Sequence, residues 1–129
     1  MIRVLCVDDR DDERYLLRRR LGRIGVPVTI TEADSATAAA RSLAEAAFDV
    51  VFLDVSMPVV SGIDFLPRLA ELLADGAHLA VPAVVFYTAS VDPADQETAF
   101  QYPFVRGFLS KEAALDEVRD VLMRAVEPV

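Results

Sequence analysis

The sequence predicts an α/β protein in which helices cover both faces of a parallel β-sheet. Five short apolar runs alternate with five segments whose apolar residues recur at helical spacing, and this alternation is typical of repeated βαβ units. The run at residues 50–53 is apolar at every position and leads into Asp54, as expected for a strand buried on both faces at the centre of the sheet. Pro58 and Ser61-Gly62 then mark a loop.

The strands are predicted from apolar runs that are bounded by polar or turn-forming residues. In chain order they are residues 2–7, 28–31, 50–54, 83–87 and 104–109. The first strand leads directly into Asp8 and Asp9, the fourth into Thr88, and the fifth into Ser110 and Lys111.

The helices are predicted between and after these runs. The acidic cluster 11–13 suits the start of the first helix, and Gly25 is expected to end it. Asp92 and Pro93 suit the start of a short fourth helix that Pro103 ends, and Asp75-Gly76 stops the third. The apolar positions that recur at helical spacing are Leu17, Leu21 and Ile24; Ala36, Ala40, Leu43 and Ala47; Phe65, Leu66, Leu69 and Leu73; and Leu115, Val118, Leu122 and Ala125.

Length, charge and cysteine content indicate a single globular domain. The chain has 129 residues, 53% of them hydrophobic, which suits one domain with its own core. A net charge of −8 disfavours binding to nucleic acid, and no apolar run is long enough for a membrane span. The start Met1-Ile2-Arg3-Val4 is expected to enter a strand at once, which leaves no room for a signal peptide. The single cysteine, Cys6, is expected in the core, and we expect a cytoplasmic protein.

The strand ends carry the candidate functional residues. In a parallel sheet all strands end at one edge, which is expected to gather Asp8, Asp9, Asp54, Thr88 and Lys111. Carboxylates that meet there repel one another unless a cation joins them, and hard oxygen ligands suit Mg²⁺. With one histidine, His78, and one cysteine, a zinc site is excluded.

Each of these residues also has a simpler interpretation. Asp8 and Asp9 could cap a helix, and Asp54 could cap a turn or the next helix. Thr88 could be an N-cap, and Lys111 could be an exposed charge. Capping alone does not explain why all five polar residues follow strand ends. A metal, a lysine and a hydroxyl together could hold the oxygens of a transferring phosphoryl group, with Asp54 as the nucleophile.

Over nearly all 129 residues the chain resembles the receiver domain of two-component response regulators, of the single-domain chemotaxis type. The matching features are Asp8-Asp9, Asp54 with Met57-Pro58 and Gly62 behind it, Thr88-Ala89, and Lys111. The resemblance implies a flavodoxin-like fold with strand order 2-1-3-4-5. It also implies that residues 1–129 form one receiver domain with no output domain.

The resemblance further implies a role for each site residue. Asp54 would accept a phosphoryl group from a phosphohistidine on a sensor histidine kinase or a histidine phosphotransfer protein. Asp9, Asp54 and the backbone carbonyl of Ser56 would bind Mg²⁺ directly, and Asp8 mainly through water. Lys111 would pair with the phosphoryl group, and Thr88 would move to donate a hydrogen bond to it. Such a domain catalyses only its own phosphorylation and dephosphorylation, and it signals to a downstream effector protein as a monomer or weak dimer.

Two positions depart from the family pattern. Glu112 follows Lys111 where the family usually has proline in a cis peptide bond, so a trans bond is expected and the position of Lys111 is left open. Phe108 stands at the switch position, where tyrosine is commoner. Because phenylalanine has no hydroxyl to satisfy, we expect Phe108 to be largely inward even without phosphate.

Two other functions compete with this one. A pseudo-receiver would keep the fold as an interaction module independent of phosphorylation, but the complete set of five polar residues argues against it. A phosphatase of the haloacid dehalogenase type would also use an aspartate at a strand end. That class needs a second acid two residues later, where this chain has Ser56, so it ranks last.

Overall fold

The computed structural model describes residues 1–75 and 81–127, in which five strands alternate with five helices. The strands are β1 (Ile2–Val7), β2 (Val28–Ala33), β3 (Val50–Leu53), β4 (Ala83–Thr88) and β5 (Val105–Ser110). The helices are α1 (Asp11–Leu21), α2 (Ala36–Glu45), α3 (Gly62–Asp75), α4 (Pro93–Ala99) and α5 (Leu115–Ala125). Within the described ranges, no helix has the length and apolar character needed to cross a membrane.

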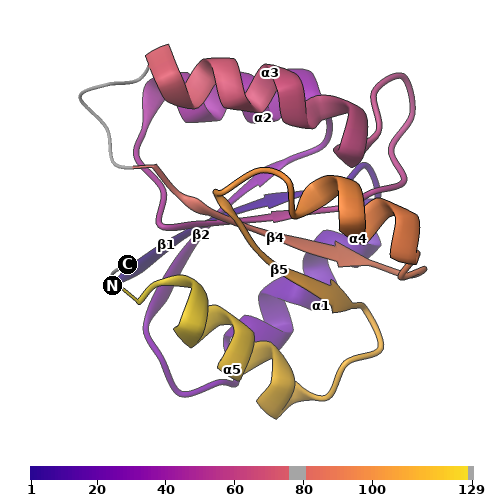
Figure 1. Ribbon diagram of the computed structural model, residues 1–129. Helices are drawn as coiled ribbons and strands as arrows, with labels where there is room; N and C mark the ends of the chain where they lie inside the picture. The colour runs from indigo at the N-terminus through magenta and orange to yellow at the C-terminus, as the bar shows by residue number, and fades with distance from the viewer. Residues whose placement is uncertain (76–80, 128–129) are drawn as a thin grey trace.

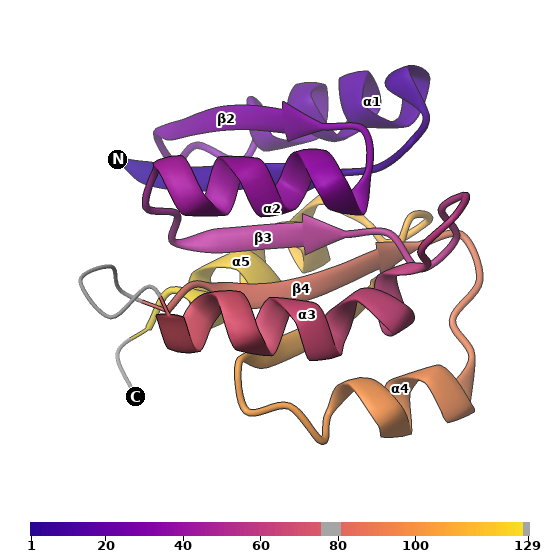
Figure 2. The same ribbon diagram turned by 90° about the horizontal axis from the view of Figure 1, so that it is seen from above.

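All five strands are parallel and form one sheet in the order β2-β1-β3-β4-β5 (Figure 2). The predicted flavodoxin-like α/β fold is therefore confirmed. β3 is the middle strand, and each of its four residues is buried. That position explains why its sequence is continuously apolar rather than alternating.

The helices form two layers, with α2, α3 and α4 on one face of the sheet and α1 and α5 on the other (Figure 1). Successive strand residues point to opposite faces, so each central strand contributes to two separate cores. In β3, Val51 and Leu53 pack toward α2 and α3, whereas Val50 and Phe52 pack toward α1 and α5. The site at the strand ends thus rests on a sheet that is packed on both sides.

Two predicted helix ends were wrong. α1 ends at Leu21, not at Gly25: the Gly22 N–H still donates to the Arg18 carbonyl, but the Arg23 N–H donates to the Arg20 carbonyl, so the chain tightens out of the helix. Ile24 is still buried, but it lies in the following turn, where Gly25 has a φ of 76°. α2 ends at Glu45, so Ala47 lies outside it. The buried face of α2 is made by Ala36, Ala39 and Leu43.

The fourth helix was predicted to run too far. α4 starts as expected, with the Asp92 carboxylate accepting from the Ala94 N–H at 2.8 Å and Pro93 in the first turn. It ends at Ala99, before Pro103, and the chain then turns through residues that are not helical. β5 begins at Val105, one residue after the predicted start. Gly76 and His78 lie outside the described residues.

Cys6 is a core residue, as the sequence predicts. It is buried in β1 on the face covered by α1 and α5. Burial raises the pKa of its thiol to about 12, and the nearby charges of Asp8 and Glu32 act in the same direction. The thiol is therefore protonated at neutral pH and is a packing group rather than a nucleophile.

Candidate functional site

The carboxyl edge of the sheet brings together polar residues that are far apart in the sequence. Asp8 follows β1, and its N–H donates to the Ala33 carbonyl at 3.1 Å. Asp54 follows β3, and its N–H donates to the Val7 carbonyl at 3.0 Å. Each residue is thus tied by its backbone to the end of a neighbouring strand, which fixes where its side chain begins.

The loop after Asp54 needs a glycine at its far end. The N–H of Gly62, the first residue of α3, donates to the Val55 carbonyl at 2.9 Å. A Cβ atom at position 62 would lie only 2.2 Å from the carbonyl oxygen of Asp54. Gly62 therefore allows α3 to start directly against the backbone of Asp54.

Three carboxylates meet at this edge. One oxygen from each of Asp8, Asp9 and Asp54 lies within 4.8 Å of the other two. Asp8 and Asp54 are 4% and 5% exposed, whereas Asp9 is exposed. The Ser56 N–H donates to Asp54 Oδ1 at 3.4 Å, and Ser56 itself is exposed. The cluster offers hard oxygen donors with one side open to solvent, which suits a small divalent cation that keeps some of its water.

Lys111 lies among these carboxylates. Its Nζ is 2.7 Å from Asp8 Oδ2, 3.4 Å from Asp54 Oδ2 and 3.6 Å from Glu13 Oε2. It is the only lysine in the sequence. The peptide bond to Glu112 is trans, so the side chain reaches the site without a cis bond. Burial alone would lower the pKa of Lys111, but the hydrogen bond to Asp8 and the charge of Asp54 raise it overall, and the ammonium stays charged.

The surroundings of Asp54 disfavour its ionised form unless a positive charge lies nearby. Burial raises its pKa above the usual value, and the negative charge of Asp8 raises it further. Lys111 and the Ser56 N–H oppose this shift by favouring the ionised form. A buried, electron-rich oxygen with cationic neighbours can act as a nucleophile toward an anionic group once its charge is offset.

Thr88 and Phe108 occupy the β4 and β5 side of the edge. Thr88 is 2% exposed, and its Oγ1 makes long contacts of 3.4 Å to the carbonyl and the N–H of Ser90. These contacts are local and weak, so the hydroxyl can exchange them for a stronger acceptor. Phe108 is half-buried and stacks on Phe86 with a centroid separation of 5.2 Å. Its ring packs against the core, in the inward direction expected from the sequence.

Some contacts around the site were not predicted. Arg14 of α1 donates from Nη1 to the Asp8 carbonyl at 2.7 Å, and Arg20 of α1 contacts the loop that follows Lys111. The only signal for Arg20 is its place beside Leu21 on the core-facing side of the helix, where a charged residue is unusual. The reach of a long arginine side chain depends on how α1 packs, which periodicity does not reveal.

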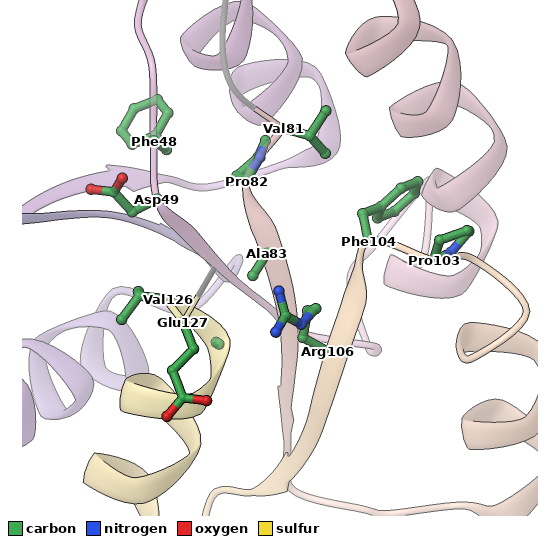
Figure 3. Close-up of a pocket in the computed structure, with 11 residues that line it drawn as sticks. Phe48, Asp49, Val81, Pro82, Ala83, Pro103, Phe104, Arg106, Val126 and Glu127 are labelled. Carbon is green, nitrogen blue, oxygen red and sulfur yellow. The ribbon is translucent and has the colours of Figure 1, made fainter. Parts of the chain in front are cut away.

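A separate hollow lies at the opposite, amino-terminal edge of β3, β4 and β5 (Figure 3). It has a volume of about 470 Å³. None of the predicted site residues lines it. Its Asp49 is engaged by Arg3, whose Nη2 donates to Asp49 Oδ1 at 3.0 Å. The chemistry predicted from the sequence therefore belongs to the carboxyl edge.

Comparisons with known proteins agree with this geometry. The family model described as "Response regulator receiver domain" matches residues 4–123. The chain is 30% identical to the response regulator GacA of Pseudomonas viridiflava over 118 residues, which cover 92% of this chain and 52% of GacA. It is 33% identical to the virulence sensor protein BvgS of Bordetella pertussis over 126 residues, 97% of this chain and 10% of BvgS. The chain thus spans from a tenth to about half of the length of these two relatives.

Solved structures show the same fold. The chemotaxis protein CheY4 of Vibrio cholerae matches with a TM-score of 0.79 at 23% identity, covering 97% of this chain and 98% of that one. TrrA of Thermotoga maritima, solved in complex with Mg²⁺-BeF, matches with a TM-score of 0.78 at 22% identity, covering 97% and 99%. A receiver domain is a phospho-acceptor signalling module rather than a conventional enzyme. The chain belongs to the response regulator receiver domain family.

Proposed function

We propose that Asp54 accepts a phosphoryl group from a phosphohistidine on a sensor histidine kinase or a histidine phosphotransfer protein. One observation carries the proposal: in a receiver-domain chain, the buried carboxylate of Asp54 lies beside a second buried acid, Asp8, and the single lysine, Lys111, contacts both. Burying one carboxylate next to another is unfavourable for the free energy of folding. A role for Asp54 as a nucleophile accounts for this arrangement.

In the proposed step, an Asp54 carboxylate oxygen forms a bond to phosphorus while the bond from phosphorus to the imidazole nitrogen of the donor breaks. The electron pair of that bond stays on the imidazole, which then takes up a proton from solvent. Lys111 transfers its hydrogen bonds from carboxylate oxygens to a phosphoryl oxygen. Thr88 donates its hydroxyl to another phosphoryl oxygen in exchange for its long contacts to Ser90. Both donors act where negative charge is present in the transition state.

The proposed cofactor is Mg²⁺. Asp9, Asp54 and the Ser56 carbonyl would be direct ligands, and Asp8 would bind mainly through water. The donor set supports this assignment, because it contains only hard oxygens and one acid, Asp9, faces solvent. The Mg²⁺-BeF complex of TrrA is consistent with it. The ion would supply positive charge that offsets repulsion between the carboxylates and the phosphoryl oxygens.

The proposed partners follow from the same chemistry. Relatives such as BvgS and GacA are a sensor protein and a response regulator, which supports a kinase or phosphotransfer protein as the phosphoryl donor. The signal would pass to a downstream effector protein through contacts that depend on phosphorylation, with Thr88 and Phe108 as the switch residues. We propose α4 and α5 as the elements that choose the effector. The proposed form is a monomer or weak dimer in the cytoplasm that binds neither nucleic acid nor membranes.

The test is labelling by a small phosphodonor. With acetyl phosphate and Mg²⁺, intact-mass analysis is expected to show one added phosphoryl group on the wild-type protein. Asp54→Asn is expected to remain unlabelled, and Asp64→Asn, at an exposed position on α3, is the matched control that keeps labelling. Labelling of Asp54→Asn, or labelling of wild type in excess EDTA, would contradict the assignment.

A further inference from the structure

Arg20 connects α1 to the loop that carries Lys111. Its Nη1 donates to the hydroxyl of Tyr87 at 2.6 Å and to the carbonyl of Lys111 at 3.2 Å. Its Nη2 donates to the carbonyl of Ala113. The Tyr87 hydroxyl is also 3.5 Å from the Lys111 carbonyl. One guanidinium therefore holds two carbonyls of the loop 111–114 and one phenol of β4.

Apart from Arg20, the loop is held at its two ends by β5 and α5 and by the packing of Ala113 against the core. It contains Glu112, Ala113 and Ala114, without a proline or a glycine to restrict the backbone. Its own contacts are local, with the Ala113 N–H donating to the Ser110 carbonyl at 3.0 Å and the Glu112 N–H donating to Ser110 Oγ at 3.1 Å. These bonds do not tie the carbonyls of Lys111 and Ala113 to the rest of the molecule. Arg20 donates to both carbonyls and so links them to α1.

The position of this loop decides where the Lys111 ammonium can be. The Lys111 N–H is fixed to the Thr88 carbonyl at 2.9 Å, and its side chain must then bridge Asp8 and Asp54. A displacement of the backbone at Lys111 that breaks this bond would move the start of that side chain relative to both acids. The rigid fork of an arginine suits the task, because its donors can satisfy several acceptors in a fixed arrangement.

A simpler role for Arg20 would be to offset the partial negative charge at the end of α1. Arg18 and Arg19 lie in the same last turn and bring positive charge to the same helix end. Arg20 differs from them because it is half-buried and reaches the loop on the face that α1 and α5 share (Figure 1). Charge at the helix end does not require these contacts.

We infer that Arg20, supported by Tyr87, is a positioning residue that holds the loop 111–114 so that Lys111 meets the phosphoryl group on Asp54. The inference rests on the proposed function, since Lys111 must contact the phosphoryl group for its position to matter. Arg20 touches neither the carboxylates nor the phosphoryl group, and acts through the backbone of the loop.

The first test compares Arg20→Gln and Arg20→Lys with the matched control Arg23→Gln, which changes an exposed arginine just after α1. The rate of phosphorylation by acetyl phosphate in Mg²⁺ is expected to fall roughly ten- to hundredfold in both Arg20 variants, as for a misplaced catalytic group. Lysine keeps the charge but lacks the fork, so it is expected not to rescue the rate. The Mg²⁺ dissociation constant from calorimetry is expected to change less than about twofold, because the carboxylates remain in place.

The second test separates positioning from general destabilisation. In a Lys111→Met background, Arg20→Gln is expected to cause no further loss of rate, because its effect passes through Lys111. A general loss of structure would slow both backgrounds by the same factor. Amide hydrogen exchange at residues 112–114, measured without metal or phosphodonor, is expected to be faster in Arg20→Gln than in wild type and Arg23→Gln.

The outcomes distinguish this role from the proposed function. If wild type takes up no phosphoryl group, the proposed function fails and the role of Arg20 fails with it. If wild type is labelled and Arg20→Gln is labelled as fast, the role of Arg20 alone is wrong. An equal loss of rate in the wild-type and Lys111→Met backgrounds, or unchanged exchange at residues 112–114, would also overturn it.

Discussion

Lys111 supplies the positive charge that allows Asp8 and Asp54 to be buried side by side without a metal. Its Nζ contacts an oxygen of each acid at 2.7 and 3.4 Å. Both acids are almost fully buried, so water screens their repulsion poorly. The same ammonium competes with any cation that binds the carboxylates.

Lys111→Met is therefore expected to lower the free energy of unfolding in EDTA by about 1–3 kcal/mol, less than for a fully buried pair because this site faces an open edge. Mg²⁺ is expected to raise the melting temperature of Lys111→Met by more than that of wild type, since no ammonium competes and the unfolded chain lacks the site. Thermal unfolding with and without Mg²⁺ measures both effects. A variant as stable as the control Arg23→Met in EDTA, with the same response to Mg²⁺ as wild type, would contradict this.

Val59, in the loop after Asp54, has an unfavourable backbone conformation. Its φ is 69°, in the left-handed region that β-branched residues avoid, and its side chain is fully exposed. Val59→Asn is expected to raise the free energy of unfolding by about 1 kcal/mol, because asparagine tolerates this region. Urea unfolding provides the measurement, with Val91→Asn at another exposed valine as the control. Equal effects at the two positions would show that backbone strain is not the cause.

At the scale of elements, the start of α3 is matched to the end of β3 through Gly62. Gly62→Ala is expected to reduce the free energy of unfolding by about 2 kcal/mol or more, because the new Cβ would meet the rigid backbone of Asp54. Gly22→Ala is the matched control. Its Cβ would lie 3.4 Å from the Arg19 carbonyl, at an ordinary helical φ of −68°. Urea unfolding that gives the same loss for both variants would mean that the close approach at Gly62 is not the reason for its glycine.

The sequence predicts the strands better than the helix ends. Buried runs such as β3 are recognisable because every position is apolar, and β1 was predicted with its observed bounds. The ends of α1 and α2 were placed too late, because apolar residues at helical spacing continue into the turns that follow. The end of α4 was placed too late because it was predicted from Pro103, whereas the helix ends at Ala99. Ile24 is the clearest case, since it packs into the core from outside the helix.

The sequence reveals the site residues that lie at strand ends, but not those whose role depends on how the helices pack. Asp8, Asp54 and Lys111 were found because strand ends of a parallel sheet share one edge, a rule that needs no side-chain geometry. Arg20 and Tyr87 were missed because their roles depend on how far a long side chain reaches from α1, and on which face of β4 a phenol lies. Such contacts arise only when the layers pack.

At the scale of the whole molecule, acidic side chains in and beside the sheet form ion pairs with arginines from other elements. Glu32 of β2 accepts from Arg14 at 2.9 Å and from Arg18 at 2.7 Å. The hydrogen bond from Arg18 is the main reason that the pKa of Glu32 lies below its usual value, with Arg14 adding to it against the opposing effect of burial. Arg3 lowers the pKa of Asp49 in the same way.

The lowered pKa of Glu32 determines how the free energy of unfolding changes with pH. A carboxyl with a lower pKa in the folded state stabilises the fold above its unfolded pKa, and the contribution is lost as the pH falls through the folded pKa. Stability from Glu32 is therefore expected to be complete at neutral pH and to disappear in the acid range below pH of about 4.3. Glu32→Gln is expected to flatten this part of the curve of urea midpoint against pH, whereas Glu45→Gln, at an exposed position on α2, keeps it. An unchanged acid slope in Glu32→Gln would show that the ion pairs with α1 do not stabilise the fold.

Phosphorylation of Asp54 is tested most directly by locating the phosphoryl group on the chain. Borohydride reduces an aspartyl phosphate to homoserine and releases phosphate, so peptide mapping after reduction identifies the residue that carried it. For protein treated with acetyl phosphate and Mg²⁺, we expect homoserine at position 54 alone, and none when EDTA is present. Homoserine at position 8 or 9, or a labelled protein that yields none at position 54, would contradict this expectation.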